Sequence, residues 1–111
     1  ALEGAEILAM LWNMPAFSND GSMLHRLTST RAFENRMFAV SCNRIGESAG
    51  MSFFGYSAIA DPLGELLASA EGEEGIIYAQ LEQDTLLRER AQMPVFRDRR
   101  PDLYGELVKP L

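Results

Sequence analysis

A thiol and an imidazole form the residue pair in this sequence with the clearest capacity for chemistry. Cys42 and His25 are the sole residues of their types, and a nucleophilic cysteine needs a base or a positive field to hold it as the thiolate. Cys42, however, lies inside the apolar run MFAVSCN, residues 37–43, and free cysteine is among the most often buried residues. We therefore expect Cys42 to be a buried structural residue and His25 to have a surface role.

Paired carboxylates offer a second route to chemistry, as a general acid and base. Glu71, Glu73 and Glu74 lie close together, but glycines flank them in a predicted turn. Charged side chains in such a turn are expected to be solvated rather than held as a catalytic pair. No glycine-rich stretch matches the GxGxxG or P-loop pattern of phosphate-binding loops. From these residues alone, the sequence indicates no particular reaction.

The charge balance and the single cysteine narrow the class of protein. Sixteen acidic and ten basic residues give a formal charge of −6, which argues against a nucleic-acid-binding surface. The arginines at 97, 99 and 100 alternate with Asp98 and Asp102; we expect ion pairs there, with an anion-binding surface as the alternative. One cysteine forms neither an internal disulfide nor a metal cluster, so we expect no metal and a reducing, cytoplasmic environment.

Membrane insertion and secretion are not expected from the sequence. No run reaches the roughly 18 continuous apolar residues of a membrane span, and no basic segment followed by an apolar one opens the chain. We therefore expect no membrane partner.

The first third of the chain predicts a strand, a turn and a helix. Residues 5–12, AEILAMLW, are apolar throughout and predict a strand buried on both faces. Residues 18–21 combine turn-forming residues. A helix is predicted from Ser22, as its N-cap, to about Arg36. Within it, Arg31 and Glu34 have the spacing of an ion pair.

The middle of the chain predicts two further strands and a hairpin. Residues 37–43 predict a second buried strand, residues 46–50 a loop, and residues 53–60 a third strand. Asp61-Pro62-Leu63-Gly64 is typical of a tight turn, because proline fixes its own φ and glycine closes the turn. We therefore expect a β-hairpin over residues 53–70.

The last third predicts one more strand and a short helix. GIIYAQLE, residues 75–82, has alternating character and predicts a strand. Asp84 is a candidate cap for a helix that runs through Ala91 and ends before Pro94. The tail is expected to be irregular, anchored by Leu103 and Tyr104. Together these elements predict an α/β fold with a mixed sheet and flanking helices.

Four segments resemble, in the same order, motifs of the nitrilase superfamily of carbon–nitrogen hydrolases. LEGAEIL followed by NMP resembles "GADLLLVPANWP", and RAFENRMFAVSCNRIG resembles "RAIENQVFVVAANRVG". FFGYSAIADPLGELLASAEGEEGIIYAQLE resembles the "FFGGSMIVDPWGEVLAEA" hairpin and the strand after it, and FRDRRPDLYGEL is similar to the tail of many bacterial members. The similarity covers essentially the whole chain, so residues 1–111 resemble the C-terminal portion of a single domain of this family.

The resemblance implies a fold and an activity. Members have an αββα sandwich and hydrolyse nitriles, amides or carbamoyl amides with a cysteine, a glutamate and a lysine, without a cofactor. All three residues would lie upstream of the portion matched here. Cys42 matches a small residue of the "AANRVG" strand, Lys109 lies beyond the final motif, and no glutamate matches the family base. The resemblance therefore implies that this chain contains no catalytic residue, is inactive alone, and pairs with an N-terminal half in a homo-oligomer.

The resemblance also implies which residues face the substrate. Asn13 matches the asparagine after the catalytic strand, where members contact substrate, and Phe54, Gly55 and Ser57 match the "FxGxS" segment near the pocket. Met14 stands where tryptophan is usual, so the substrate stays open among amides, carbamoyl amides and nitriles. Two functions remain: a piece of such a hydrolase, or a non-catalytic structural or subunit-interaction fragment with the same fold.

Overall fold

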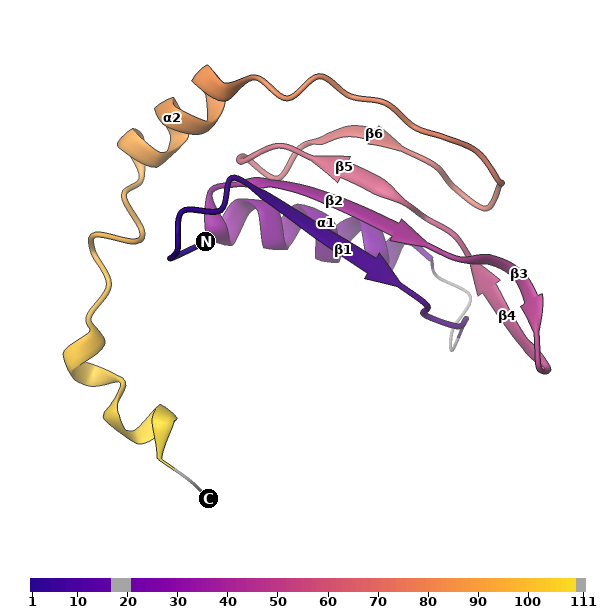
Figure 1. Cartoon of the computed structure of the whole chain (residues 1–111), viewed down its shortest axis with the longest axis horizontal. Helices are drawn as coiled ribbons and strands as arrows, with labels where there is room; N and C mark the ends of the chain where they lie inside the picture. The colour runs from indigo at the N-terminus through magenta and orange to yellow at the C-terminus, as the bar shows by residue number, and fades with distance from the viewer. Residues whose placement is uncertain (17–20, 110–111) are drawn as a thin grey trace.

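The computed structural model describes residues 1–16 and 21–109. Residues 17–20, which carry most of the predicted turn at 18–21, lie outside the described residues. The elements (Figure 1) are β1 (Ile7–Trp12), α1 (Ser22–Asn35), β2 (Phe38–Asn43), β3 (Ile45–Ser48), β4 (Met51–Phe54), β5 (Ala58–Ala60), β6 (Leu66–Ser69), α2 (Gln83–Gln92) and the 3-10 turns Pro101–Leu103 and Gly105–Val108.

A mixed four-stranded sheet in the order β1-β2-β5-β6 forms the centre of the molecule. β1 and β2 are parallel, which requires a crossover connection, and α1 provides it. β5 pairs antiparallel with β2 and β6. The turn between β5 and β6 is the predicted one: the Asp61 carboxylate accepts hydrogen bonds from the backbone N–H groups of Leu63 and Glu65, at 2.9 and 3.0 Å. The expected mixed sheet and this hairpin are confirmed.

Helix α1 covers one face of the sheet (Figure 1). Ala32, Ala39 and Ala60 are buried together in this layer, and their small side chains allow the helix to approach the strands closely. The buried hydroxyl groups of Thr28 and Ser41 are hydrogen-bonded at 2.8 Å across the same interface. This contact satisfies both hydroxyl groups where water is excluded. The face of β2 that carries Ser41 therefore faces α1.

The helices have the predicted extents, with small shifts at their N-termini. α1 begins at Ser22 with Gly21 as its N-cap, so the prediction of Ser22 as the cap is wrong by one residue. The predicted ion pair is confirmed, with Arg31 Nη1 3.0 Å from Glu34 Oε2. α2 has Glu82 as its N-cap, and Asp84 lies in its first turn. A carboxylate there still favours the helix, because it faces the positive end of the helix dipole.

The region after β2 differs from the predicted loop and single strand. Residues 46–50 belong to a hairpin of β3 and β4, which turns at Ala49 and Gly50 with φ of 53° and 75°. The predicted strand 53–60 is divided into β4 and β5 by a bend at Gly55 and Tyr56, with φ of 75° and 60°. The predicted loop at residues 46–50 is thus a tight hairpin, and the bend at Gly55 was not predicted.

The second face of the sheet is uncovered over β1 and around Cys42 of β2, which corrects two predictions, although Phe38 on the same face is buried against Leu86 of α2. Along β1, exposure alternates, and Leu11 is 86% exposed and Ile7 52% exposed. The strand predicted at 5–12 is thus buried on one face only. Cys42, the partner of Leu11 in the register, is exposed rather than buried. The molecule is 20 Å thick along its shortest axis, which fits one sheet with one helical layer.

The segment 75–82 and the tail also differ from expectation. Residues 75–82 are extended but are not assigned as a strand, and Ile76 and Tyr78 are 77% and 80% exposed. The tail leads away from the sheet (Figure 1). Leu103 is 65% exposed and does not anchor it, whereas Arg99 lies over the Tyr104 ring at 5.5 Å. Within the described residues, no helix has the length and apolar character needed to span a membrane.

Candidate functional site

The predicted pocket residues lie at one end of the four-stranded sheet. β1 and β2 are parallel, so their carboxyl ends meet at the same edge, where Asn13 follows β1 and Asn43 ends β2. β5 runs antiparallel to β2 and begins at this end, so residues 54–57, which precede it, lie there as well. The carboxyl ends of parallel strands are the usual place for ligands in open α/β sheets.

Asn43 ties these segments together, although sequence reasoning did not single it out. Its side chain is buried, with 7% exposure for the residue. Oδ1 accepts a hydrogen bond from the Met14 N–H at 3.0 Å, and Nδ2 donates to the Met14 and Gly55 carbonyl oxygens at 3.3 and 3.0 Å. The Asn43 backbone N–H donates to Ser57 Oγ at 3.1 Å. An asparagine that ends a buried strand was the available signal, because such a side chain must find polar partners.

The backbone at Gly55 has no room for a larger residue. Gly55 has a φ of 75°, and a Cβ at this position would lie 2.8 Å from the Glu71 carbonyl oxygen. The Gly55 N–H donates to the Arg44 carbonyl at 3.1 Å, and the Tyr56 N–H donates to the Glu71 carbonyl at 2.9 Å. The bend between β4 and β5 is therefore fixed against both the end of β2 and the segment after β6.

Aromatic rings cover the side of this bend that faces α1. Phe54 contacts Tyr56 edge to face, with ring centroids 5.9 Å apart, and Tyr56 lies 5.2 Å from His25. His25 is half-buried, and its Nε2 is buried with no hydrogen-bond partner among the described residues. His25 therefore packs against Tyr56, and Phe54 is a packed ring at the edge of the site.

Two adjoining hollows open beside these residues. The smaller, of about 290 Å³, contains Gly55 and Ser57 of the predicted pocket residues in its wall; Asn13 and Phe54 are not in it. Cys42, Asn43 and Glu73 also line it. The larger hollow, of about 670 Å³, is lined by residues 69–77, and the two hollows share Ala70, Glu71, Glu73, Glu74 and Gly75.

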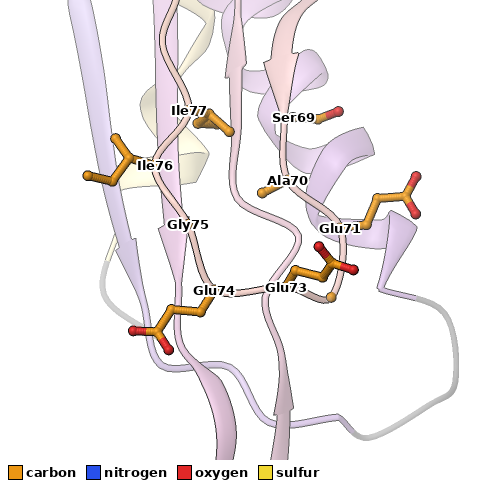
Figure 2. Close-up of a pocket in the computed structure, with 9 residues that line it drawn as sticks. Ser69, Ala70, Glu71, Glu73, Glu74, Gly75, Ile76 and Ile77 are labelled. Carbon is orange, nitrogen blue, oxygen red and sulfur yellow. The ribbon is translucent and has the colours of Figure 1, made fainter.

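Figure 2 shows the larger hollow between the end of β6 and the extended segment that follows the 72–75 turn. Ile77 and Glu73 point into the space between the two segments, and Ile76 and Glu74 point away from it. Glu71, Glu73 and Glu74 are all exposed. The prediction that these carboxylates are solvated is confirmed for the chain as it stands.

The structure does not bring the single thiol and the single imidazole together. Ser41 faces α1, and successive side chains of a strand point to opposite faces, so Cys42 lies on the face away from α1. His25 belongs to α1. The sheet separates the two residues, which rules out a Cys–His pair in this arrangement. Among the described residues, no three His, Cys, Asp or Glu side chains form a cluster that could hold a metal.

The arginines of the tail form the expected ion pairs. Arg97 Nε lies 2.8 Å from Asp98 Oδ1, and Arg100 Nη2 lies 2.6 Å from Asp102 Oδ2. The hydrogen bond from Arg100 lowers the pKa of the Asp102 carboxyl. Arg97 and Arg100 are paired with carboxylates, which confirms the ion-pair interpretation for these two, whereas Arg99 lies over the Tyr104 ring.

Comparison with known proteins adds to this geometry. Residues 1–90 match the family described as carbon–nitrogen hydrolase. The chain is 36% identical over 104 residues to the 2-oxoglutaramate amidase of Bacillus subtilis, covering 92% of this chain and 39% of that protein. It is 37% identical over 122 residues to the N-carbamoylputrescine amidase of Solanum tuberosum, covering 97% of this chain and 41% of that protein. The chain thus spans about two-fifths of the length of these relatives.

A solved structure agrees with these sequence relatives. The crystal structure of a carbon–nitrogen hydrolase from Helicobacter pylori superposes with a TM-score of 0.84 at 29% identity, over 97% of this chain and 42% of that one. The match of the family over most of the chain, the two amidases and this superposition agree with the motifs found in the sequence. The chain belongs to the carbon–nitrogen hydrolase family.

Proposed function

We propose that residues 1–111 are the C-terminal portion of a single hydrolase domain that cleaves amide carbon–nitrogen bonds. In this proposal the chain supplies part of the pocket wall, with Asn13, Phe54, Gly55 and Ser57 on the substrate side. The nucleophilic cysteine, the glutamate base and the lysine come from an N-terminal portion. The observation that supports this proposal most directly is the set of hydrogen bonds made by Asn43. They join Met14, next to Asn13, to the segment of Gly55 and Ser57 at the carboxyl ends of β1 and β2.

The uncovered sheet face supports the need for an N-terminal portion. About three-fifths of each amidase relative has no counterpart in this chain. Leu11 and Ile7 of β1 are exposed on the face opposite α1, and a second layer packed there would bury them. Exposed apolar surface of this kind marks an interaction site. The homo-oligomer of the assembled protein is proposed from the resemblance to the family, and the lone cysteine supports a cytoplasmic location.

The chemistry assigned to the chain is binding and orientation. Hydrolysis of an amide by a thiol passes through a tetrahedral intermediate and a covalent acyl-enzyme, which water then cleaves. The Asn13 carboxamide offers both a donor and an acceptor to a substrate amide group. The Ser57 hydroxyl accepts the Asn43 N–H and keeps its own hydrogen for a second partner. Amides and carbamoyl amides are favoured over nitriles, because the two relatives described above are an amidase of each kind.

The alternative is a non-catalytic fragment that serves in structure or subunit interaction. The observation that favours it is the same uncovered face, since a surface that binds an N-terminal half could equally bind another protein. Complementation distinguishes the two. An N-terminal portion carrying the Cys, Glu and Lys would be supplied as a second polypeptide, and release of ammonia from simple amides and carbamoyl amines would be measured.

The hydrolase proposal predicts activity that requires both polypeptides. Activity should be lost when the cysteine of the N-terminal portion is changed to alanine and retained in a Cys42→Ala variant of this chain, which serves as the matched control. A folded complex of the two polypeptides without any hydrolysis would refute the hydrolase proposal and favour the interaction fragment.

A further inference from the structure

The Asn43 side chain extends the pairing of β1 with β2 beyond the last residues of the strands. Trp12 and Asn43 are the final partners in the parallel register. Two residues after Trp12, where β1 has ended, the Met14 backbone forms a reciprocal pair of hydrogen bonds with the Asn43 carboxamide. The carboxamide oxygen accepts from the Met14 N–H at 3.0 Å, and the carboxamide nitrogen donates to the Met14 carbonyl at 3.3 Å. The side chain thus takes the place that a peptide group of a neighbouring strand would occupy.

The same amide group reaches the second pocket segment. Its Nδ2 donates a further hydrogen bond to the Gly55 carbonyl at 3.0 Å. An uncharged carboxamide has two N–H donors and one carbonyl oxygen, and in this arrangement each takes part in a hydrogen bond. Asn43 is 7% exposed, so water competes little for these bonds. No other common side chain of this size has both a donor and an acceptor in this planar geometry.

The loop that carries Asn13 depends on this contact. After β1, the chain is held by Asn43 at Met14 and then by the β3–β4 hairpin, where the Ala16 N–H donates to the Ser52 carbonyl at 2.8 Å. Asn13 itself is exposed and directly precedes the residue bound by Asn43. Hydrogen bonds therefore hold the backbone directly after Asn13 at Met14 and at Ala16.

We propose that Asn43 is a positioning residue that fixes the loop of Asn13 relative to Gly55 and Ser57. The effect on substrate binding rests on the proposed function, whereas the effect on the loop does not. Asn43 would not touch substrate. It would act through Asn13, by holding the backbone on which Asn13 is mounted at a constant distance from the other pocket wall.

Amide hydrogen exchange in the folded, assembled protein tests the positioning role without any need for activity. In Asn43→Ala, exchange of the Met14 amide should accelerate about tenfold or more, because its hydrogen-bond acceptor is removed. Exchange of Ala39, buried in the central strand, should change little. The matched control is Asn35→Ala, which removes an exposed amide that donates to the Arg31 carbonyl at 3.0 Å and should leave Met14 unchanged.

A second variant guards against loss of folding. Asn43→Asp keeps the size of the side chain and the acceptor for Met14 but removes both donors, so the acceleration at Met14 should be smaller than in Asn43→Ala. Equal exchange at Met14 in the wild type and both variants would overturn the inference. So would an equal acceleration at Met14 and Ala39, because Asn43 would then stabilise the whole fold rather than position the loop.

A double-mutant cycle in the complemented enzyme tests the coupling to substrate binding. Asn13→Ala and Asn43→Ala should each raise the KM for an amide more than they lower kcat, and the double variant should lose little beyond Asn13→Ala alone. Fully additive losses would show that Asn43 does not act through Asn13. A wild-type complex without activity would refute the proposed function, while the exchange experiment would still decide the positioning role.

Discussion

Replacement of Leu11 by alanine tests whether the uncovered sheet face is a docking surface. Leu11 is 86% exposed, lies on the edge strand β1 on the face opposite α1, and is paired with Cys42 in the parallel register. The change removes apolar surface without adding charge or a polar group. Its side chain contributes little to the core of the chain itself, so folding of the α1 layer should be preserved.

The expected magnitude follows from the surface that docking would remove from water. The change from leucine to alanine removes three side-chain carbon atoms. Burial of apolar surface stabilises the assembled protein by ~0.8 kcal/mol per methylene group. Complete burial of Leu11 in the assembled protein therefore contributes about 2 kcal/mol, which corresponds to about 30-fold in a dissociation constant. The formal charge of −6 opposes self-association only weakly, because salt at physiological strength screens surface charge within roughly 8 Å.

Sedimentation equilibrium across a dilution series measures this effect. The wild-type chain should associate, with itself or with an added N-terminal portion, and Leu11→Ala should weaken that association by about 30-fold. Leu87→Ala is the matched control, because Leu87 is also exposed, at 54%, but lies on α2 outside the sheet face. Equal weakening by both variants would refute the assignment of the docking face. A wild-type chain that stays monomeric and unfolds cooperatively at every concentration would refute the need for a second layer.

Three further predictions concern the chain alone. It should not hydrolyse amides, nitriles or carbamoyl amines, as measured by ammonia release; turnover that disappears in Cys42→Ala would contradict this. Cys42 should react with a thiol reagent at dilute concentration nearly as fast as in denaturant, because it is exposed, and more slowly once association covers it; slow labelling at every concentration would contradict the exposed position. Gly55→Ala should lower the free energy of unfolding, measured in urea, by at least ~1 kcal/mol more than Gly50→Ala. Both glycines have a φ of 75°, but only at Gly55 would an added Cβ meet the Glu71 carbonyl oxygen. Equal losses in the two variants would contradict that contact.

Local patterns predicted the elements that depend on neighbouring residues in the chain. The helix over residues 22–35, the ion pair of Arg31 and Glu34, and the turn at Asp61 were predictable because spacing and turn chemistry determine them locally. The order strand, helix, strand predicted a mixed α/β fold, and the structure contains it as β1, α1 and β2. The four segments that resemble family motifs, in the same order along the chain, then indicated the family.

The burial of side chains was harder to predict, because it depends on which elements pack against each face of the sheet as well as on the sequence. The apolar runs of β1 and β2 are typical of strands covered on both faces, but in this chain the face opposite α1 is covered only in part, where Phe38 packs against Leu86 of α2. Leu11 and Cys42 are therefore exposed, and residues 75–82 are extended without being assigned as a strand. The apolar side chains of these segments are typical of strands that are covered on both faces.

The role of Asn43 could not be predicted from local pattern either. Its three side-chain hydrogen bonds join residues 29 and 12 positions away along the chain. Only the pairing of β1 with β2 and the bend at Gly55 bring those backbone groups to one point. The sequence signalled a polar residue at the end of a buried strand, and the fold determined its partners.

We propose that this chain supplies the C-terminal pocket wall of an amide hydrolase. A chimera tests it most directly: residues 1–111 would replace the matching portion of the 2-oxoglutaramate amidase of Bacillus subtilis, which this chain matches at 36% identity. We expect a folded chimera that releases ammonia from an amide substrate, with activity reduced by Asn13→Ala and unaffected by Cys42→Ala. A chimera that folds and assembles but shows no hydrolysis of amides or carbamoyl amines would contradict it.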